Sequence, residues 1–320
     1  MTMEKRPLGP KGPQLSVVAL GGHEYLPDGR SRGFNEDRAL ATSPGHISPG
    51  YGGAARVALL RAAYELGINV FDVTMDSEKD ALRRNLQEAP PPYEIHVQTR
   101  PEGMCYGYDA NNQKLLDMQL LRAEVQRTLR MLGREVIDLF NIGLLDDSVR
   151  HDPDYMARLS ANVMQLKQEG LIRFAVADSH SGERLYLQML QAGVFDAVNL
   201  DLNFGDPSGL ERVVPTARAA GMHVIAREAM LKGALFRIGS TIGLEDRGML
   251  ACVAMKWLGA QRPDIIIVGA ENTAQLKQNV RALADPEMSA HEQAAFDMLC
   301  RCEAFREHTL VKVQRFLGLH

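Results

Sequence analysis

The sequence is poor in cysteine and in long apolar runs, and each shortage excludes a class of protein. Four cysteines among 320 residues are too few and too scattered for a disulfide scaffold. No stretch of about 18 consecutive apolar residues is present, so we expect no helix that spans a membrane. Residues 1–7 contain no apolar run followed by a small-residue cleavage site, so secretion is not expected. The sequence therefore predicts a reduced protein of the cytoplasm.

The chain also lacks an excess of positive charge. Its 36 lysines and arginines face 40 aspartates and glutamates, which gives a net charge of −4. General nucleic-acid binders are usually basic, so we expect no nucleic-acid partner. Hydrophobic residues make up 45% and charged residues 24%, which is typical of a soluble globular chain. The length fits either two average domains or one (β/α)8 barrel.

Short apolar runs alternate with helical patterns along the whole chain. The expected strands are 16–20, 68–72, 94–99, 136–142, 172–177, 197–200, 223–226 and 264–268. Near-continuous apolar strands are typical of a parallel sheet that is covered on both faces. Five glycines stand where a helix should end with positive φ before the next strand, namely Gly67, Gly133, Gly170, Gly193 and Gly221. Eight such units without a linker predict an α/β fold, a single-domain (β/α)8 TIM barrel over residues 1–320.

Three segments fall outside this repeat. Residues 5–15 are rich in turn formers and predict a short hairpin that closes the bottom of the barrel. Residues 22–52 form a long polar, glycine-rich stretch, which we expect to lie as a loop over the mouth. Residues 289–320 have amphipathic spacing and predict C-terminal helices packed outside the barrel.

Charged residues follow several of the predicted strands, where the chemistry of a (β/α)8 barrel takes place. Three carboxylates, Asp72, Asp178 and Glu228, and two guanidinium groups, Arg100 and Arg227, would meet at this mouth. Unpaired charges there are costly, so we expect Asp72 to pair with Arg100. One such pair is often structural, but charges that come from four different strands favour a functional site.

Six segments of the chain resemble the aldo-keto reductase superfamily, over about residues 5–285. They are 67–74, 137–142, 170–173, 198–203, 224–228 and, at the adenosine end of the cofactor, 267–279. The resemblance implies the barrel fold, a nicotinamide cofactor and a catalytic tetrad of aspartate, tyrosine, lysine and histidine.

This sequence departs from that tetrad at three of its four places. Asp72 keeps the aspartate, but Ser77 stands near the place of the tyrosine that gives a proton to the carbonyl. Arg100 replaces the lysine and cannot lose a proton, and Gly143 replaces the histidine. The resemblance is therefore to an atypical member with a degenerate tetrad, for which the usual carbonyl-reductase mechanism is not supported.

The positions that hold the cofactor in the resembled superfamily are changed more at the nicotinamide end than at the adenosine end. At the nicotinamide, Arg227 replaces the stacking tyrosine, Asn199 replaces a longer glutamine, and Asp178 follows strand five. At the adenosine end, Gly269 and Ala270 lead into a helix whose N-terminus could face a phosphate. Gln278 and Asn279 match places that hold adenine, while Gln275 replaces an arginine that would bind a 2′-phosphate. The resemblance thus implies NAD or NADP as cofactor, without strict selectivity for NADP.

Two hypotheses follow from these residues. In the first, the protein is an atypical nicotinamide-dependent oxidoreductase of a small polar or acidic substrate. Asp72 and Arg100 then shape the field, and His180, Glu228 or a loop tyrosine transfers the proton. The loop tyrosines are Tyr25, Tyr51, Tyr106 and Tyr108.

In the second, the barrel carries a non-redox lyase or isomerase, or a binding protein without turnover. A pocket that is charged rather than aromatic favours this alternative. In either case Arg227 is our candidate anchor for a substrate carboxylate or phosphate, because Arg100 would be held by Asp72. No metal-ligand spacing recurs, so we expect no metal, and the oligomeric state stays open.

Overall fold

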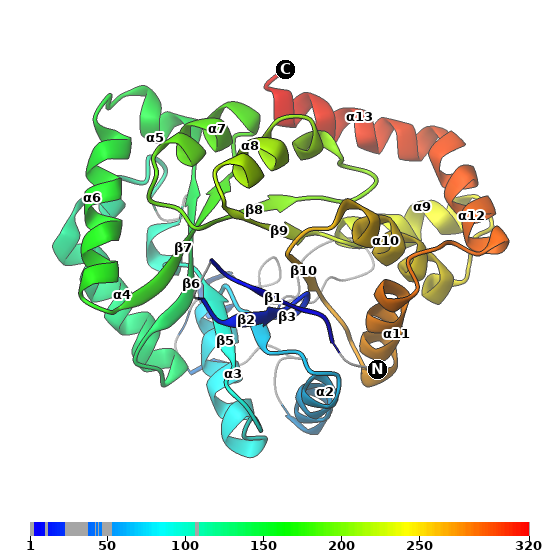
Figure 1. Ribbon diagram of the computed structural model, residues 1–320, viewed down its shortest axis with the longest axis horizontal. Helices are drawn as coiled ribbons and strands as arrows, with labels where there is room; N and C mark the ends of the chain where they lie inside the picture. The colour runs from blue at the N-terminus through cyan, green and yellow to red at the C-terminus, as the bar shows by residue number, and fades with distance from the viewer. Residues whose placement is uncertain are drawn as a thin grey trace.

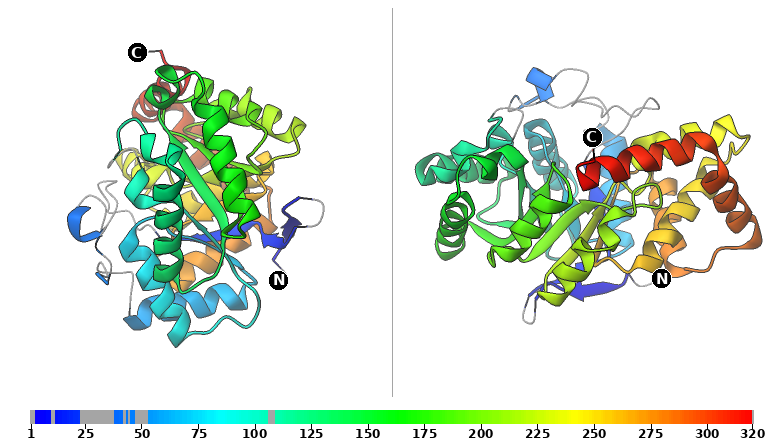
Figure 2. Two further views of the ribbon diagram at one scale, coloured as in Figure 1. Left: turned by 90° about the vertical axis from the view of Figure 1, so that its left-hand side faces the viewer. Right: turned by 90° about the horizontal axis from the view of Figure 1, so that it is seen from above.

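The computed structural model describes residues 3–9, 12–22, 38–41, 43, 45–46, 53–105 and 109–319 (Figure 1). Most of the predicted excursion at 22–52 lies outside these residues, so its course over the mouth stays a prediction. The tyrosines at 25, 51, 106 and 108 lie outside them as well. Within 22–52, the short helix α1 (Arg38–Ala41) is described, and it lies at the end of the barrel opposite the N-terminal hairpin (Figure 2).

Eight parallel strands close into a barrel, which confirms the predicted fold. Around the barrel the order is β10, β3, β4, β5, β6, β7, β8, β9. The strands are β3 (Val18–Gly21), β4 (Val70–Asp72), β5 (His96–Thr99), β6 (Ile137–Leu144), β7 (Ile172–Ser179), β8 (Ala197–Asp201), β9 (His223–Arg227) and β10 (Ile265–Val268). Strands β6 and β7 each run two residues beyond their predicted ends, because Gly143 pairs with Asp178 and Leu144 with Ser179.

Helices follow the strands and cover the outside of the barrel (Figure 1). They include α2 (Gly53–Glu65), α3 (Asp76–Glu88), α4 (Met118–Leu132), α6 (Tyr155–Gln168), α7 (Glu183–Gln191), α8 (Val213–Ala219), α10 (Arg247–Gln261) and α11 (Thr273–Ala284). The five glycines before strands all adopt positive φ, as the sequence predicts. At Gly133, for example, φ is 64° and the backbone N–H caps the carbonyls of Leu129 and Arg130.

Shorter elements complete the loops on the mouth side. They are α5 (Asp146–Arg150), α9 (Ala234–Thr241), and the 3-10 turns η1 (Glu102–Met104), η2 (Gln113–Leu116), η3 (Ser208–Leu210) and η4 (Leu231–Gly233). Glu228, Leu231 and Lys232 have positive φ, so the chain after β9 turns through unusual backbone conformations beside the cavity.

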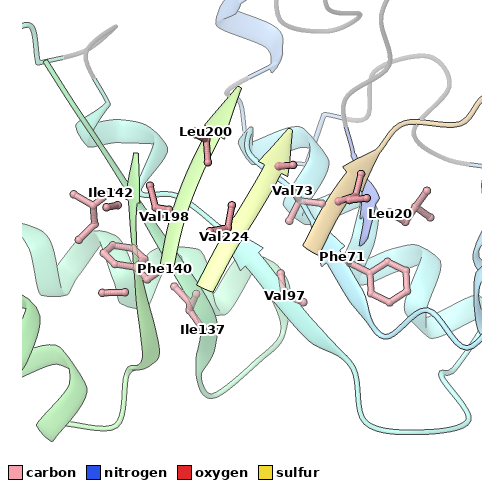
Figure 3. Close-up of a cluster of buried hydrophobic side chains, with 14 of the residues drawn as sticks. Leu20, Phe71, Val73, Val97, Ile137, Phe140, Ile142, Val198, Leu200 and Val224 are labelled. Atoms are coloured by element: carbon pink, nitrogen blue, oxygen red, sulfur yellow. The ribbon is translucent and has the colours of Figure 1, made fainter. Parts of the chain in front are cut away.

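The apolar core has two layers that follow from strand alternation. Outward side chains such as Phe71, Phe140, Ile142, Val198 and Leu200 pack against the helices (Figure 3). Inward side chains fill the lower half of the barrel, namely Ala19, Val70, Leu139, Val176, Ala197, Ile225 and Ile265. Above this plug the inward positions become polar. That change places the site at the C-terminal ends of the strands.

The predicted N-terminal hairpin is formed by β1 (Lys5–Pro7) and β2 (Gln14–Ser16), which pair antiparallel. Leu8 and Leu15 are buried against the inward apolar plug. His223, at the start of β9, places its Nε2 2.6 Å from the carbonyl oxygen of Pro7. The hairpin therefore closes the lower end of the barrel.

The C-terminal tail forms α12 (Ala290–Arg301) and α13 (Glu303–Leu317). A small aromatic cluster, in which Phe204 stacks on Phe305 at 5.0 Å, fixes the start of α13. From there α13 runs back across the molecule toward α7 (Figure 2). The tail lies outside the strands, but three of its residues, Lys312, Arg315 and Phe316, reach the mouth.

Candidate active site

One cavity of about 820 Å³ lies at the C-terminal ends of the strands. Twelve of the residues that the sequence proposes for the site line it. The four proposed catalytic residues there are Asp72, Arg100, His180 and Glu228. The eight proposed cofactor-binding residues are Asp178, Asn199, Arg227, Gly269, Ala270, Gln275, Gln278 and Asn279. The fold thus brings together residues that lie up to 207 positions apart, although lining a cavity does not by itself assign their roles.

The expected ion pair between Asp72 and Arg100 is wrong. Arg100 Nε instead donates to Glu102 Oε2 at 2.7 Å, and Glu102 is buried in η1. Asp72 Oδ1 accepts a hydrogen bond from Gln98 Nε2 at 3.0 Å. The register explains the difference, because Asp72 pairs with Gln98 across β4 and β5, which leaves Arg100 two residues nearer the mouth.

Arg227 is held by two carboxylates and is not the unpaired anchor that we expected. Its Nη1 lies 2.6 Å from Asp178 Oδ2, and its Nε lies 2.6 Å from Asp201 Oδ1. Burial alone would lower the pKa of Arg227, but these two carboxylates outweigh burial and raise that pKa well above its usual value. The guanidinium therefore ties β9 to β7 and β8 inside the mouth.

Lys312 of α13 completes the charged mouth, and the sequence analysis missed it. Its Nζ lies 3.1 Å from Glu228 Oε2, 3.3 Å from Asp201 Oδ2 and 4.0 Å from Asp206 Oδ2. Lys232 makes a further ion pair with Glu228. The signal was a lysine that shares the inner face of α13 with Phe305 and Phe316, since these positions recur at helical spacing.

The carboxylates of this cluster differ sharply in acidity. Burial would raise the pKa of Asp201, but Arg227 and Lys312 outweigh it and hold that pKa far below its usual value. Burial and the neighbouring Asp201 raise the pKa of Asp206 to about 6, against the pull of Lys312. Asp206 should therefore change charge near neutral pH.

His180 follows the end of β7 and lines the same cavity. Burial lowers its pKa to about 4 against the effect of Asp178, whose Oδ2 lies 4.0 Å from His180 Nε2, and Arg227 and Arg100 act in the same direction as burial. At pH 7 its imidazole is therefore neutral. A neutral imidazole is a poor proton donor but keeps one N–H for hydrogen bonding.

The far end of the cavity is built from α11 and the loop that precedes it. Asn272 Oδ1 caps the helix by accepting from Gln275 N at 3.0 Å. The Gln275 side chain folds back, so that its Oε1 accepts from Glu271 N at 2.9 Å. Gln278 Nε2 lies 3.5 Å from Cys252 Sγ, and Asn279 is buried. Arg247, at the start of α10, lies over the Phe236 ring at 4.6 Å.

The chain is similar to known proteins over most of its length. Residues 53–300 match the model of the aldo/keto reductase family. This chain belongs to the aldo/keto reductase family. An uncharacterised oxidoreductase of Schizosaccharomyces pombe is 25% identical over 254 residues, which are 76% of this chain and 78% of that protein.

Two solved structures share the fold of this aldo/keto reductase at low sequence identity. A glycerol dehydrogenase from Gluconobacter oxydans superposes with a TM-score of 0.63 and 19% identity, covering 95% of this chain and 97% of that one. An aldo-keto reductase from Pseudomonas aeruginosa gives a TM-score of 0.60 and 19% identity, covering 89% and 96%. At this level of identity the likeness concerns the fold.

Two absences bear on this aldo/keto reductase. No helix among the described residues is long and apolar enough to cross a membrane. In the same part of the chain, no three histidine, cysteine or acidic side chains cluster as metal ligands would.

Ser77, which stands near the family's tyrosine place, is buried in the first turn of α3 and does not line the cavity.

Proposed function

We propose that this aldo/keto reductase is a nicotinamide-dependent oxidoreductase that acts on a small polar substrate. The observation that carries the proposal is the extent of the cavity. It is continuous from Asp72 and His180 at the strand ends to Gln278 and Asn279 on α11. A site for a small substrate alone would not need the far end. A dinucleotide needs both ends, with its reactive ring near the strands and its adenosine near α11.

Two buried amide oxygens support a nicotinamide at the near end. Asn199 Oδ1 and Asn141 Oδ1 line the cavity and have no hydrogen-bond partner among the described residues. A buried acceptor without a partner costs about 1–3 kcal/mol. A carboxamide NH2 has two N–H donors and could satisfy both oxygens. The residues present therefore fit the group, which would supply a hydride when bound.

At the strand ends, different side chains of the protein then take the electrostatic and the proton-transfer roles. Asp72, held by Gln98, and Arg100, held by Glu102, set the electrostatic field around the reacting carbon. His180 is neutral at pH 7 and so is unsuited to give up a proton. Proton transfer is then left to Glu228, which faces Lys312 and Lys232, or to a tyrosine outside the described residues.

The test is titration of the purified protein with NADH and with NADPH, followed by calorimetry. We expect saturable binding of at least one of them, with no more than about tenfold preference, because Gln275 is folded onto Glu271. We also expect turnover of 4-nitrobenzaldehyde to be slow, since Ser77 cannot replace a tyrosine proton donor from inside α3. Absence of binding for both nucleotides would disprove the proposed function.

One observation favours a non-redox function on the same barrel. The guanidinium of Arg227, locked between Asp178 and Asp201, stands where the resemblance implies an aromatic ring against nicotinamide. The same titration separates the two functions when AMP is included. Binding of AMP without added affinity from the nicotinamide half would favour the non-redox alternative.

A further inference from the structure

The imidazole of His180 lies directly against Gly143 at the strand ends of the cavity. Strands β6 and β7 run side by side there, and His180 N donates to the carbonyl oxygen of Leu144 at 2.9 Å. A Cβ on residue 143 would lie 2.8 Å from His180 Nε2 and 3.1 Å from His180 Cδ2. Real Cβ atoms do not approach other atoms that closely, so any side chain at 143 would displace the imidazole. Glycine at this position is what admits His180.

Burial, helped by two nearby arginines, keeps this imidazole neutral at pH 7. Burial is the main cause of its lowered pKa, and the nearby Arg227 and Arg100 act in the same direction. Asp178 and Asp201 act in the opposite direction but do not prevail. A neutral imidazole beside two arginines donates a hydrogen bond through one N–H without competing as an acid.

The imidazole is also close to the other groups of the reaction end. Together with Arg100 and Gly143 it lines a small side pocket, and together with Asp72 and Arg100 it lines the main cavity. A polar oxygen of a ligand at the strand ends would therefore lie near both His180 and Arg100. Hydrogen-bond donors that are fixed before reaction stabilise negative charge that develops on such an oxygen.

We propose that His180, which reaches from β7 into the space over Gly143, donates the hydrogen bond to the carbonyl oxygen of the substrate. This inference rests on the proposed function. The resemblance implies a histidine at residue 143 on β6. Here residue 143 is a glycine, and the imidazole beside it belongs to His180 at the end of the neighbouring strand.

The first test concerns the place of the imidazole and needs no ligand. The His180 ring signals are assigned by NMR on histidine-labelled protein through their loss in His180→Gln. We expect a neutral ring from pH 5 to pH 8 in the wild type. In Gly143→Ala, displacement should bring the pKa of the imidazole back toward its usual value. Gly103→Ala is the matched control, because a Cβ there would lie 3.4 Å from Glu124, an ordinary contact.

The second test concerns the hydrogen bond. Isotope-edited infrared spectra of 4-nitrobenzaldehyde labelled at the carbonyl are recorded on the protein, with and without NAD+ or NADP+. We expect the carbonyl stretch to shift to lower frequency in the wild type, to keep part of that shift in His180→Gln, and to lose it in His180→Leu. His151→Gln, which alters an exposed histidine, should behave as the wild type.

The third readout is the rate of turnover by the wild type and by the variants. Removing one donor to a developing oxyanion lowers kcat by about 10²- to 10³-fold. We expect such a fall in His180→Leu with little change in KM, and partial recovery when Gly143→His is combined with His180→Gly. A wild-type spectrum without a shift, or a shift retained in His180→Leu, would overturn the inference. Failure of both nucleotides to bind would instead count against the proposed function, while the NMR test would still decide where the imidazole lies.

Discussion

The two ends of the cavity differ in how deeply their polar residues are buried and in how their charges are paired. At the strand ends, Asp178 and Asn199 are buried, and the charges of Asp178, Asp201 and Arg227 are paired with one another. At the far end, Glu271 and Arg247 are exposed to solvent. A change at the near end should therefore be felt first in stability. A change at the far end should be felt in ligand binding with the fold intact.

Removal of Arg227 should give the largest effect. Arg227→Met leaves the buried Asp178 and the half-buried Asp201 without their shared cation, and loss of the partner of a buried charge typically costs about 3–5 kcal/mol. We expect the free energy of unfolding to fall by about that amount in urea denaturation. Arg227→Lys should lose less, because the charge is kept while the two-point geometry is lost.

Arg247→Met is the matched control at the far end. This side chain is exposed and lies over Phe236, so its removal should cost less than about 1 kcal/mol. Similar losses in the two variants would show that the near end is no more tightly coupled than the far end. If Arg227→Lys bound every acidic ligand as tightly as the wild type does, Arg227 would not be an anchor for anions.

Asp206 should make the stability of the near end depend on pH. Its pKa is raised to about 6 in the folded protein, above the usual 3.8, so the folded state holds this proton more tightly than the unfolded state. The contribution to stability is therefore full below about pH 4 and is lost as the pH rises through 6. Asp206→Asn should remove that loss. We expect the variant to match the wild type at pH 4 and to be more stable by about 2–3 kcal/mol at pH 7.5.

Urea denaturation at several pH values between 4 and 7.5 checks this prediction. Asp246→Asn offers a control at the far end, where the exposed carboxylate only caps α10. If Asp206→Asn were instead less stable than the wild type at pH 7.5 but not at pH 4, the ion pair with Lys312 at 4.0 Å would outweigh burial.

The same division explains what the sequence could predict. Strand alternation and helix-ending glycines are local patterns, so the eight strands, their order and the residues at their ends could be derived from them. Ion partners depend on register across strands. The Asp72–Arg100 pair was wrong for that reason, since Gln98 rather than Arg100 stands level with Asp72.

Lys312 shows the second limit of prediction. It lies 84 residues beyond Glu228, and only the docking of α13 across the mouth brings the two together. The place of His180 over Gly143 depends likewise on a contact between neighbouring strands that neither segment specifies alone. Contacts between inward positions of different strands are tertiary, and no spacing within one segment encodes them.

The smallest predicted effect is at Gln278, and it tests the far end by itself. Gln278 lines the cavity, and its side-chain amide donates a weak hydrogen bond to Cys252 Sγ at 3.5 Å. Gln278→Ala should therefore leave the free energy of unfolding within about 0.5 kcal/mol of the wild type. If the adenosine of a nucleotide binds here, loss of one hydrogen bond of about 1 kcal/mol should weaken NADH or NADPH about five- to tenfold by calorimetry. Gln275→Ala is the comparison, because that side chain is already engaged with Glu271 and should contribute less to the nucleotide. Lower stability with unchanged nucleotide affinity in Gln278→Ala would mean that the far end, like the near end, serves the fold first.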